Sequence, residues 1–375
     1  MASGSSGRVA VVASAQTVLR DAWSRLQHVD LIGAAVSDVL RGSGLDIGDV
    51  DVVIDCGSDV LDGRSISNCG FLGAMGAHHK EESRVEEDGL FGAVYATTKV
   101  ACGSASVALV VAYSKPSESD VSAYYAALTE PFYQRALGLD QVSTAGLMAN
   151  QYLTTTDADE EALLRIAERA WSRAAGNPWI EQSPDLRPED VARSALVADP
   201  LRSLQIARPR DGAVAVLLAS EQVARRLSDR PVWVTGMGSA MDSHLLSERL
   251  PGQLEACQVA AHMAMSRAGL KDASDVDLVE ISASSAATEA MVVEALGLAA
   301  VGHGVDCYAD GAQVDVNPSG GAVPADPIMA TGLVRLHEAS ARLAGRIGEG
   351  QPTRALAHGA GGLGMQNHCV FTLEV

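Results

Sequence analysis

The stretch Arg8-Val-Ala-Val-Val-Ala13 opens the first regular unit of the chain, and the pattern after it decides the fold. A helical stretch follows and ends at Gly44-Leu45, and Asp49-Val-Asp-Val-Val-Ile54 is typical of a second strand. A glycine-marked loop and a long helix then lead to a closing strand, Val107-Ala-Leu-Val-Val-Ala112. This unit alternates strands with helices.

The second half of the chain repeats this order. Pro231-Val-Trp-Val-Thr235 is its opening strand, and a helical stretch ends at Gly269-Leu270. Asp275-Val-Asp-Leu-Val-Glu-Ile281 and Arg354-Ala-Leu-Ala357 are the second and closing strands. The two glycines that end the matching helices, Gly44 and Gly269, are 225 positions apart. A match over so many elements indicates a duplicated domain.

The predicted fold class is α/β, with helices and sheets in αβαβα layers. The strands are apolar along their length, so both faces of each sheet should be buried under helices. Residues 115–209 are predicted to form an inserted cap of polar loops with one clear helix, Asp159 to Ala175, before Asp211–Leu218 returns as a strand of the first unit. We expect an N-terminal half at 1–225, including the cap, and a C-terminal half at 226–375.

Composition narrows the possible partners. The chain has 375 residues and a net charge of −19, which disfavours nucleic acid because such binding needs clustered Lys and Arg. The polar start, Met1 to Gly7, lacks the pattern of a signal peptide, and no apolar run reaches membrane-spanning length. Six cysteines without a CxxC pair or metal-ligand spacing are typical of reduced thiols in the cytoplasm. We therefore expect a cytoplasmic protein without a metal.

Several motifs together resemble the thiolase superfamily, most closely its sterol-carrier-type and archaeal branch. The resemblance spans nearly the whole chain, and the set is specific although a single glycine motif is weak evidence. The motifs are Ala198-Asp-Pro-Leu-Arg202, Asp211-Gly-Ala213, Glu294-Ala-Leu-Gly-Leu298, Asn317-Pro-Ser-Gly-Gly321 and Gly359-Ala-Gly-Gly-Leu-Gly364.

The resemblance implies a duplicated thiolase fold with a cap, and a coenzyme A thioester as substrate or ligand with no bound cofactor. In this family a nucleophilic cysteine at a helix N-terminus, a histidine of a Gly-His-Pro loop, a second cysteine or histidine, and an Asn or His at an oxyanion hole converge between the halves. The resemblance also assigns ligand-binding positions to the two glycine loops. These are Asn317, Gly320, Gly321, Gly361 and Gly362.

The nucleophile is the first departure from this pattern. Cys102 stands only five residues before the strand at Val107, whereas the family's cysteine precedes a whole helix, so Cys102 is expected to end that helix. A helix over Gly89–Cys102 places Glu86 at the nucleophile position, and a carboxylate is a poor acyl acceptor. The run Glu86-Glu87-Asp88 either has a direct role or is an acidic first turn that the helix dipole stabilises.

The other three elements are also changed. The Gly-His-Pro position reads Ala325-Asp326-Pro327, and Ser282 stands where relatives carry Asn or His. His358, before the final glycine run, is the best surviving acid or base, although it could be a structural histidine. Histidines 78 and 79 could reach the site or lie on a loop. In the cap, the aromatic pairs at 124–125 and 132–133 could line a pocket or simply pack.

Two functional hypotheses follow. The first is a non-catalytic or accessory subunit of a heteromeric thiolase or acyltransferase complex. It would form a homo- or heterodimer or tetramer with an active thiolase, which a small zinc-ribbon/OB-fold protein could join. The second is a repurposed acyl-CoA carbon–carbon lyase of the retro-aldol type, with Glu86 or Asp326 as base and His358 as proton donor. True thiolysis through Cys102 or another thiol is a third alternative. Whether the chain is an enzyme stays open, and we expect it to be inactive alone and active only as part of a complex or with altered chemistry.

Overall fold

The computed structural model describes residues 7–181, 187–249, 253–309, 311–348 and 350–375. Its strands are β1 (Val9–Gln16), β2 (Val52–Cys56), β3 (Glu81–Val85), β4 (Val107–Ser114), β5 (Leu196–Ala198), β6 (Leu201–Arg202), β7 (Gly212–Ser220), β8 (Val232–Met241), β9 (Leu278–Glu280), β10 (Asp315–Val316), β11 (Arg354–Gly361) and β12 (Asn367–Glu374). Its helices are α1 (His28–Ser43), α2 (Asp59–Asp62), α3 (Leu72–Met75), α4 (Gly89–Ala101), α5 (Val121–Leu128), α6 (Gln141–Thr155), α7 (Glu160–Ala175), α8 (Glu221–Leu227), α9 (Glu255–Ala268), α10 (Ala286–Ala295) and α11 (Thr331–Leu343).

The large sheet consists of two halves with the same strand order. Its order is β10-β9-β11-β12-β8-β1-β7-β4-β2-β3, so β1-β7-β4-β2-β3 matches β8-β12-β11-β9-β10 strand for strand. In both halves the first three strands are antiparallel and the last three are parallel. The halves join where residues 9–11 of β1 pair with residues 232–234 of β8. The duplication expected from the sequence is present.

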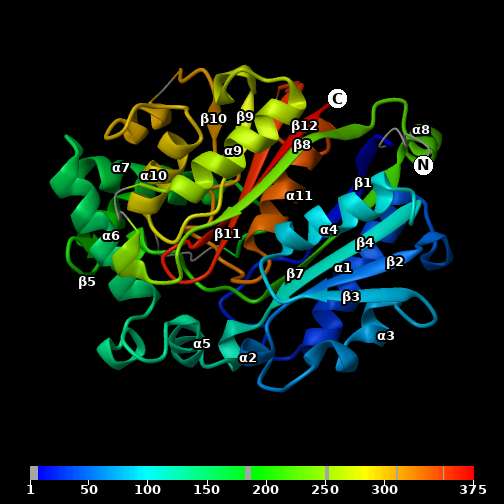
Figure 1. The fold of residues 1–375 in the computed structure, drawn as a ribbon, viewed down its shortest axis with the longest axis horizontal. Helices are drawn as coiled ribbons and strands as arrows, with labels where there is room; N and C mark the ends of the chain where they lie inside the picture. The colour runs from blue at the N-terminus through cyan, green and yellow to red at the C-terminus, as the bar shows by residue number, and fades with distance from the viewer. Residues whose placement is uncertain (1–6, 182–186, 250–252, 310, 349) are drawn as a thin grey trace.

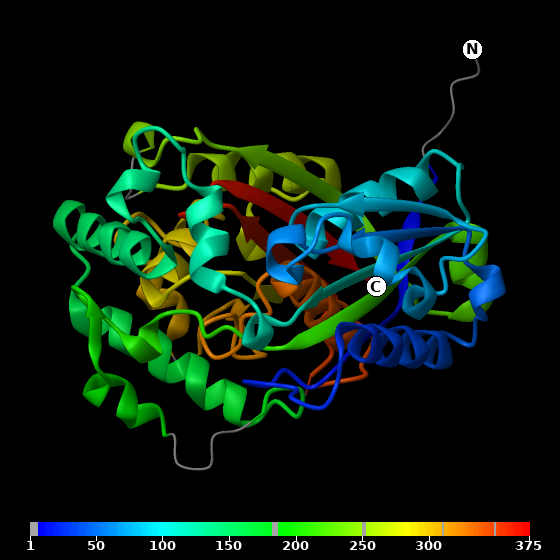
Figure 2. The same ribbon diagram turned by 90° about the horizontal axis from the view of Figure 1, so that it is seen from below.

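Helices and sheet halves alternate in layers (Figures 1 and 2). Helix α1 packs with apolar side chains on one face of the first half, and α9 and α10 pack on one face of the second half. Helices α4 and α11 share one apolar cluster with the remaining faces of both halves. These two helices form the middle layer, so their N-termini lie between the halves. The α/β fold expected from the sequence is confirmed.

Local signals explain the helix ends. Helices α1 and α9 both stop at a left-handed glycine, Gly44 and Gly269, a conformation that other residues adopt only with strain. Helix α4 ends at Cys102, as the spacing predicts. The proposed division at residue 225 stays a prediction, and that position falls inside α8, whereas residues 228–231 connect α8 to β8.

The cap contains more regular structure than the sequence indicates. The predicted helix is present as α7, with Asp159 as its N-cap. Helix α6 was not predicted, although it spans 15 residues and begins at a capping box of Asp140 and Ser143. Its buried face is made of small and mixed side chains, which gives a weak periodic signal. Among the described residues, no helix is long and apolar enough to span a membrane.

Close packing of α4 on the sheet gives a first prediction. A Cβ at Gly92 would lie 2.2 Å from Cys56 Sγ, whereas a Cβ at Gly33, inside α1, meets nothing within 4 Å. Gly92→Ala should destabilise the protein by about 1–3 kcal/mol through overpacking. Gly33→Ala should instead stabilise it by about 0.5–1 kcal/mol through helix propensity. Urea unfolding of both variants measures the change in the free energy of unfolding. An equal change in the two variants would contradict the close packing of α4 at Gly92.

Candidate functional site

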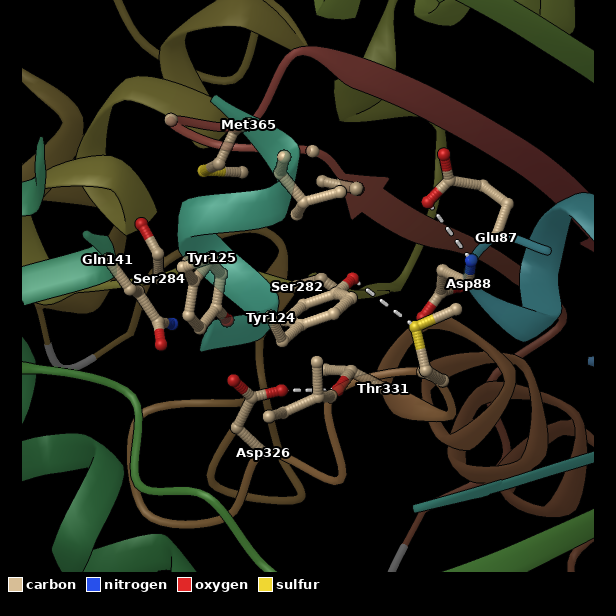
Figure 3. A pocket seen from close by; sticks show the side chains of 18 of the residues that line it. Glu87, Asp88, Tyr124, Tyr125, Gln141, Ser282, Ser284, Asp326, Thr331 and Met365 are labelled. Carbon is tan, nitrogen blue, oxygen red and sulfur yellow. Dashed lines mark hydrogen bonds between the residues drawn. The ribbon is translucent and has the colours of Figure 1, made fainter. Parts of the chain in front are cut away.

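A pocket lies at the N-termini of α4 and α11, the two helices of the middle layer (Figure 3). It is a cavity of about 70 Å³, enough for a few water molecules but far below the size of ordinary ligand pockets. Residues from both halves and from the cap line it. They are Glu87, Asp88, Tyr124, Tyr125, Leu128, Gln141, Thr144, Ser282, Ala283, Ser284, Asp326, Ile328, Met329, Thr331, Ala360, Gly361, Gly362, Gly364 and Met365.

Asp88 joins the two helices of the middle layer. It is the N-cap of α4, and one carboxylate oxygen accepts a hydrogen bond of 2.9 Å from the Leu90 N–H. The other oxygen accepts one of 2.7 Å from the Gly332 N–H, in the first turn of α11. Burial raises the pKa of Asp88 to about 8, and the two N–H donors oppose that rise. The Asp88 carboxyl group therefore accepts hydrogen bonds from two helix N-termini, whose N–H groups could otherwise bind an anion.

Two further carboxyl groups line the pocket. Glu87 accepts a hydrogen bond of 2.6 Å from the Asn367 side chain, and burial raises its pKa. Asp326 accepts a hydrogen bond from the Thr331 hydroxyl, and burial raises its pKa to about 6. Carboxyl groups with pKa values shifted toward neutrality are typical of sites for acid–base chemistry.

Ser282 contributes a hydroxyl to the same pocket. The side chain is 4% exposed, and its Oγ has no hydrogen-bond partner among the described atoms. Its backbone N–H donates to the His358 carbonyl, which ties this part of the pocket wall to β11. A buried hydroxyl without a partner is costly, so Ser282 is suited to donate to a ligand.

Two tyrosines of the cap helix α5 close the pocket. The rings of Tyr124 and Tyr125 pack edge to face, with centroids 5.1 Å apart, and both rings are buried. The Tyr124 hydroxyl donates to Met329 Sδ at 3.4 Å (Figure 3). The other aromatic pair of the cap, Phe132 and Tyr133, is 83% and 78% exposed. Of the two candidate pairs, the first therefore lines the pocket.

The structure places Glu86 outside the pocket, and its assignment to the nucleophile position stays a prediction. Its side chain is 48% exposed, and its carboxylate pairs with Arg84 at 2.8 Å and accepts from the Asp59 N–H at 2.6 Å. The N-cap of α4 is Asp88, two residues further on. The family's spacing between its cysteine and the glycine that follows selects Glu86, three residues before Gly89. In the structure, the residues of this segment that line the pocket are Glu87 and Asp88.

His358 also lies away from the pocket. Strand β11 continues to Gly361, so His358 is inside a strand, and alternation points it toward α9. Its Nε2 is 3.0 Å from Nδ1 of His368, and burial lowers its pKa well below the usual value. The pocket face of β11 carries Gly359 and Gly361 instead. The strand predicted from the sequence ended at Ala357, which hid the alternation.

The predicted ligand-binding positions separate into two groups. Gly361 and Gly362 line the pocket. Asn317, Gly320 and Gly321 do not, because they belong to a packed loop. Asn317 accepts from the Ile281 N–H at 2.8 Å and donates to Glu289 at 2.9 Å, and a Cβ at Gly320 would meet the backbone of α7 at 2.8 Å.

Other candidate residues lie on the surface. Cys102 is exposed at the C-terminal end of α4, and a hydrogen bond with Ser104 lowers its pKa. Histidines 78 and 79 are both exposed. Among the described residues that line the pocket, none is a cysteine or a histidine. The groups present there can hold or move protons, but they offer no thiol for an acyl transfer.

Fold and site together define a class: a duplicated α/β protein with a pocket at the helix N-termini between its halves. A family model for a thiolase C-terminal domain-like region matches residues 238–374. Acetyl-CoA acetyltransferase of Methanothermobacter thermautotrophicus is 26% identical over 389 residues, covering 95% of this chain and 97% of that protein. These findings support the assignment of the chain to the thiolase superfamily.

Two other similarities agree with this assignment. Sterol carrier protein 2 of Gallus gallus is 29% identical over 239 residues, which cover 60% of this chain and 43% of that protein. The chain therefore spans less than half the length of that relative. A solved structure described as an Ltp2-ChsH2(DUF35) aldolase matches with a TM-score of 0.82 and 22% identity, over 100% of this chain and 99% of that one. The thiolase fold expected from the sequence is confirmed.

The raised pKa of Asp326 predicts how stability depends on pH. Its pKa is about 6 in the folded protein and near 3.8 otherwise, so the folded state holds a proton more tightly. Stability from this group is present below about pH 4 and is lost as pH rises to about 6. The free energy of unfolding of Asp326→Asn, relative to that of the wild type, should therefore rise by up to about 3 kcal/mol when the pH is raised from about 4 to about 7. Urea unfolding at both pH values measures this.

The exposed Asp229→Asn is the matched control, since the same substitution there removes no buried carboxyl group. A gain of equal size in both variants, or no change in the Asp326 variant, would contradict the assignment of the pH effect to Asp326.

Proposed function

We propose that this chain is an accessory, non-catalytic subunit of a thiolase-type complex that acts on acyl-CoA. The observation that carries the proposal is the position of the Asp88 carboxyl group. It accepts hydrogen bonds from the N–H groups of Leu90 and Gly332, at the N-termini of α4 and α11. N–H groups at helix N-termini are donors of the kind that can stabilise an oxyanion on a thioester. With an acceptor of the protein already in place, they cannot serve a reacting carbonyl.

The remaining contents of the pocket agree with this interpretation. Glu87 and Asp326 add acidic groups rather than a thiol, and negative charge opposes a developing oxyanion. The 70 Å³ cavity beneath Tyr124 and Tyr125 has no room for an extended acyl chain in this state. An acyl-enzyme on a cysteine is therefore not expected from this subunit.

Architecture supports a role in an assembly. Strand β3 is at one end of the sheet order, with a neighbour on one side only, so its outer edge can pair with a second chain. Family resemblance places the thiolase dimer interface on this half. The solved structure with the same fold is named as a combination of Ltp2 with ChsH2, so a chain of this fold works beside another protein there. We expect a thiolase partner here, and a zinc-ribbon/OB-fold protein is a possible third component.

Affinity purification from the native host tests the assembly. A second thiolase-fold chain with a cysteine at the N-terminus of its α4 equivalent should appear in stoichiometric amount by mass spectrometry. The purified chain alone should show no thiolysis of acetoacetyl-CoA. A homo-oligomer that catalyses thiolysis by itself would overturn the proposal.

Intact-mass analysis after incubation with acetyl-CoA tests the chemistry. We expect no acetyl group on the pocket residues. Cys102→Ser is the control, because Cys102 is an exposed thiol whose pKa is lowered and could be modified at the surface. An acetyl adduct that persists in this variant and turns over with coenzyme A would contradict the assignment.

A second candidate function, an acyl-CoA carbon–carbon lyase, is favoured by Asp326 and Ser282. Asp326 has a pKa of about 6, and Ser282 has an unpartnered hydroxyl in the same pocket. In a retro-aldol step, the Asp326 carboxylate would take the 3-hydroxyl proton of a 3-hydroxyacyl-CoA. The C2–C3 bond would break, leaving a carbonyl product and a thioester enolate that a proton at C2 quenches. Ser282 would donate to the enolate oxygen.

Matched carboxyl variants separate this candidate from the first. If the chain or its complex cleaves a 3-hydroxyacyl-CoA, Asp326→Asn should lower kcat by about 100-fold or more, as expected when a general base is lost. Glu86→Gln should leave kcat unchanged, because the structure places Glu86 outside the pocket. Release of the carbonyl product measures both. Absence of cleavage, or equal losses in the two variants, would reject the lyase.

A further inference from the structure

Three buried side chains on the outer side of the second half form a cluster that the pocket does not use. They are Cys257 of α9, His358 of β11 and His368 of β12, and each is 0% exposed. One ligand atom from each lies within 4.8 Å of the other two. Thiolate and imidazole are the common ligands of Zn²⁺. The cluster thus brings together a donor set for a metal within an apolar core.

The duplicated first half shows an apolar alternative at the same place. Aligning the helices on their terminal glycines and the strands on their pairing gives a counterpart in the first half for each residue. All three counterparts are apolar and belong to a single buried core beneath α1. They are Ile32 for Cys257, Val111 for His358 and Ala213 for His368. In the first half, apolar side chains alone fill the space between the helix and the sheet. In the second half, the corresponding three positions carry side chains that can bind a metal.

Hydrogen bonding in the cluster is incomplete. His358 Nε2 and His368 Nδ1 are 3.0 Å apart, so one hydrogen lies between them. Nδ1 of His358 and Nε2 of His368 are buried and have no partner within hydrogen-bond geometry. Whichever ring donates the shared hydrogen, one outer nitrogen is then a bare acceptor and the other an N–H donor, and both are buried without a partner.

A metal ion between the facing nitrogens would take the place of the shared hydrogen. Each neutral ring would then carry its hydrogen on the outer nitrogen, as metal-bound histidines do. Zinc–nitrogen distances of about 2.0 Å and a zinc–sulfur distance of about 2.3 Å require ligand atoms roughly 3.3–3.7 Å apart. The 3.0 Å nitrogen pair is close to this spacing, and the Cys257 sulfur, which lies within 4.8 Å of the other ligand atoms, needs a movement of at most about 1 Å.

We propose that Cys257, His358 and His368 supply three ligands to one Zn²⁺ ion that links α9 to β11 and β12, with a water molecule as the fourth ligand. The site stabilises β11, whose last residue, Gly361, forms part of the pocket wall together with Gly362. Sequence spacing could not reveal it, because the three ligands come from separate elements, and Cys257 and His358 are 101 positions apart. The expectation of a metal-free chain rested on the absence of short ligand motifs.

Cobalt substitution of the full chain tests the site without any activity assay. The protein is produced with Co²⁺ in place of Zn²⁺, and metal content and the visible spectrum are recorded. We expect one Co²⁺ per chain, intense d–d bands of a tetrahedral site and a sulfur-to-cobalt charge-transfer band. Cys257→Ser should lose the charge-transfer band, and His368→Gln should lower the metal content at least tenfold.

Cys369→Ser is the matched control. Cys369 is a buried cysteine next to His368, but it faces the middle layer and lies against the Leu90 carbonyl. It should keep both the metal and the charge-transfer band. A folded wild-type chain that takes up no Zn²⁺ or Co²⁺, whether during synthesis or on refolding, would overturn the proposal. So would a charge-transfer band that survives Cys257→Ser.

Discussion

The arrangement of the pocket depends on one buried carboxyl group, that of Asp88, which bonds to the N-termini of two helices from different halves of the chain. Helix N-termini present unpaired N–H groups and partial positive charge, and two of them facing each other repel unless an acceptor lies between. Asp88 supplies that acceptor from within the chain. The packing is fitted to it, because a Cβ at Gly332 would lie 2.1 Å from its Oδ1 and one at Gly359 would lie 2.9 Å from the same atom.

This constraint explains why the same architecture can have different chemistry. An enzyme that stabilises an oxyanion needs preorganised donors free for the substrate, and helix N-termini such as those of α4 and α11 can supply donors of this kind. Here those donors already have an internal acceptor. The proposed lyase chemistry rests on Asp326 and Ser282, on the second half, and neither side chain is bonded to the Leu90 and Gly332 N–H groups that donate to Asp88.

Much of the fold could be predicted from the sequence, because strand and helix periodicities and the terminal glycines of α1 and α9 are local signals. Spacing alone likewise placed Cys102 at the C-terminal end of α4, too far along the helix to be the family's nucleophile. The candidate site was harder. The family spacing selects Glu86, whereas the structure places Glu87 and Asp88 in the pocket, and the position of a helix N-cap to within two residues cannot be read from spacing. For His358, the continuation of β11 to Gly361 decides the face on which each residue lies.

The glycines around the carboxyl groups bear on whether this pocket is a decayed site or an adapted one. A cavity that has merely lost its nucleophile has no need for backbone fitted to a different group. Yet Gly332 and Gly359 make room for Asp88, and a Cβ at Gly361 would lie 1.9 Å from Glu87 Oε1. Each glycine costs conformational entropy on folding, and larger residues there would displace the carboxyl groups. The acidic groups are therefore built into the pocket, so either proposed function must use them as they stand.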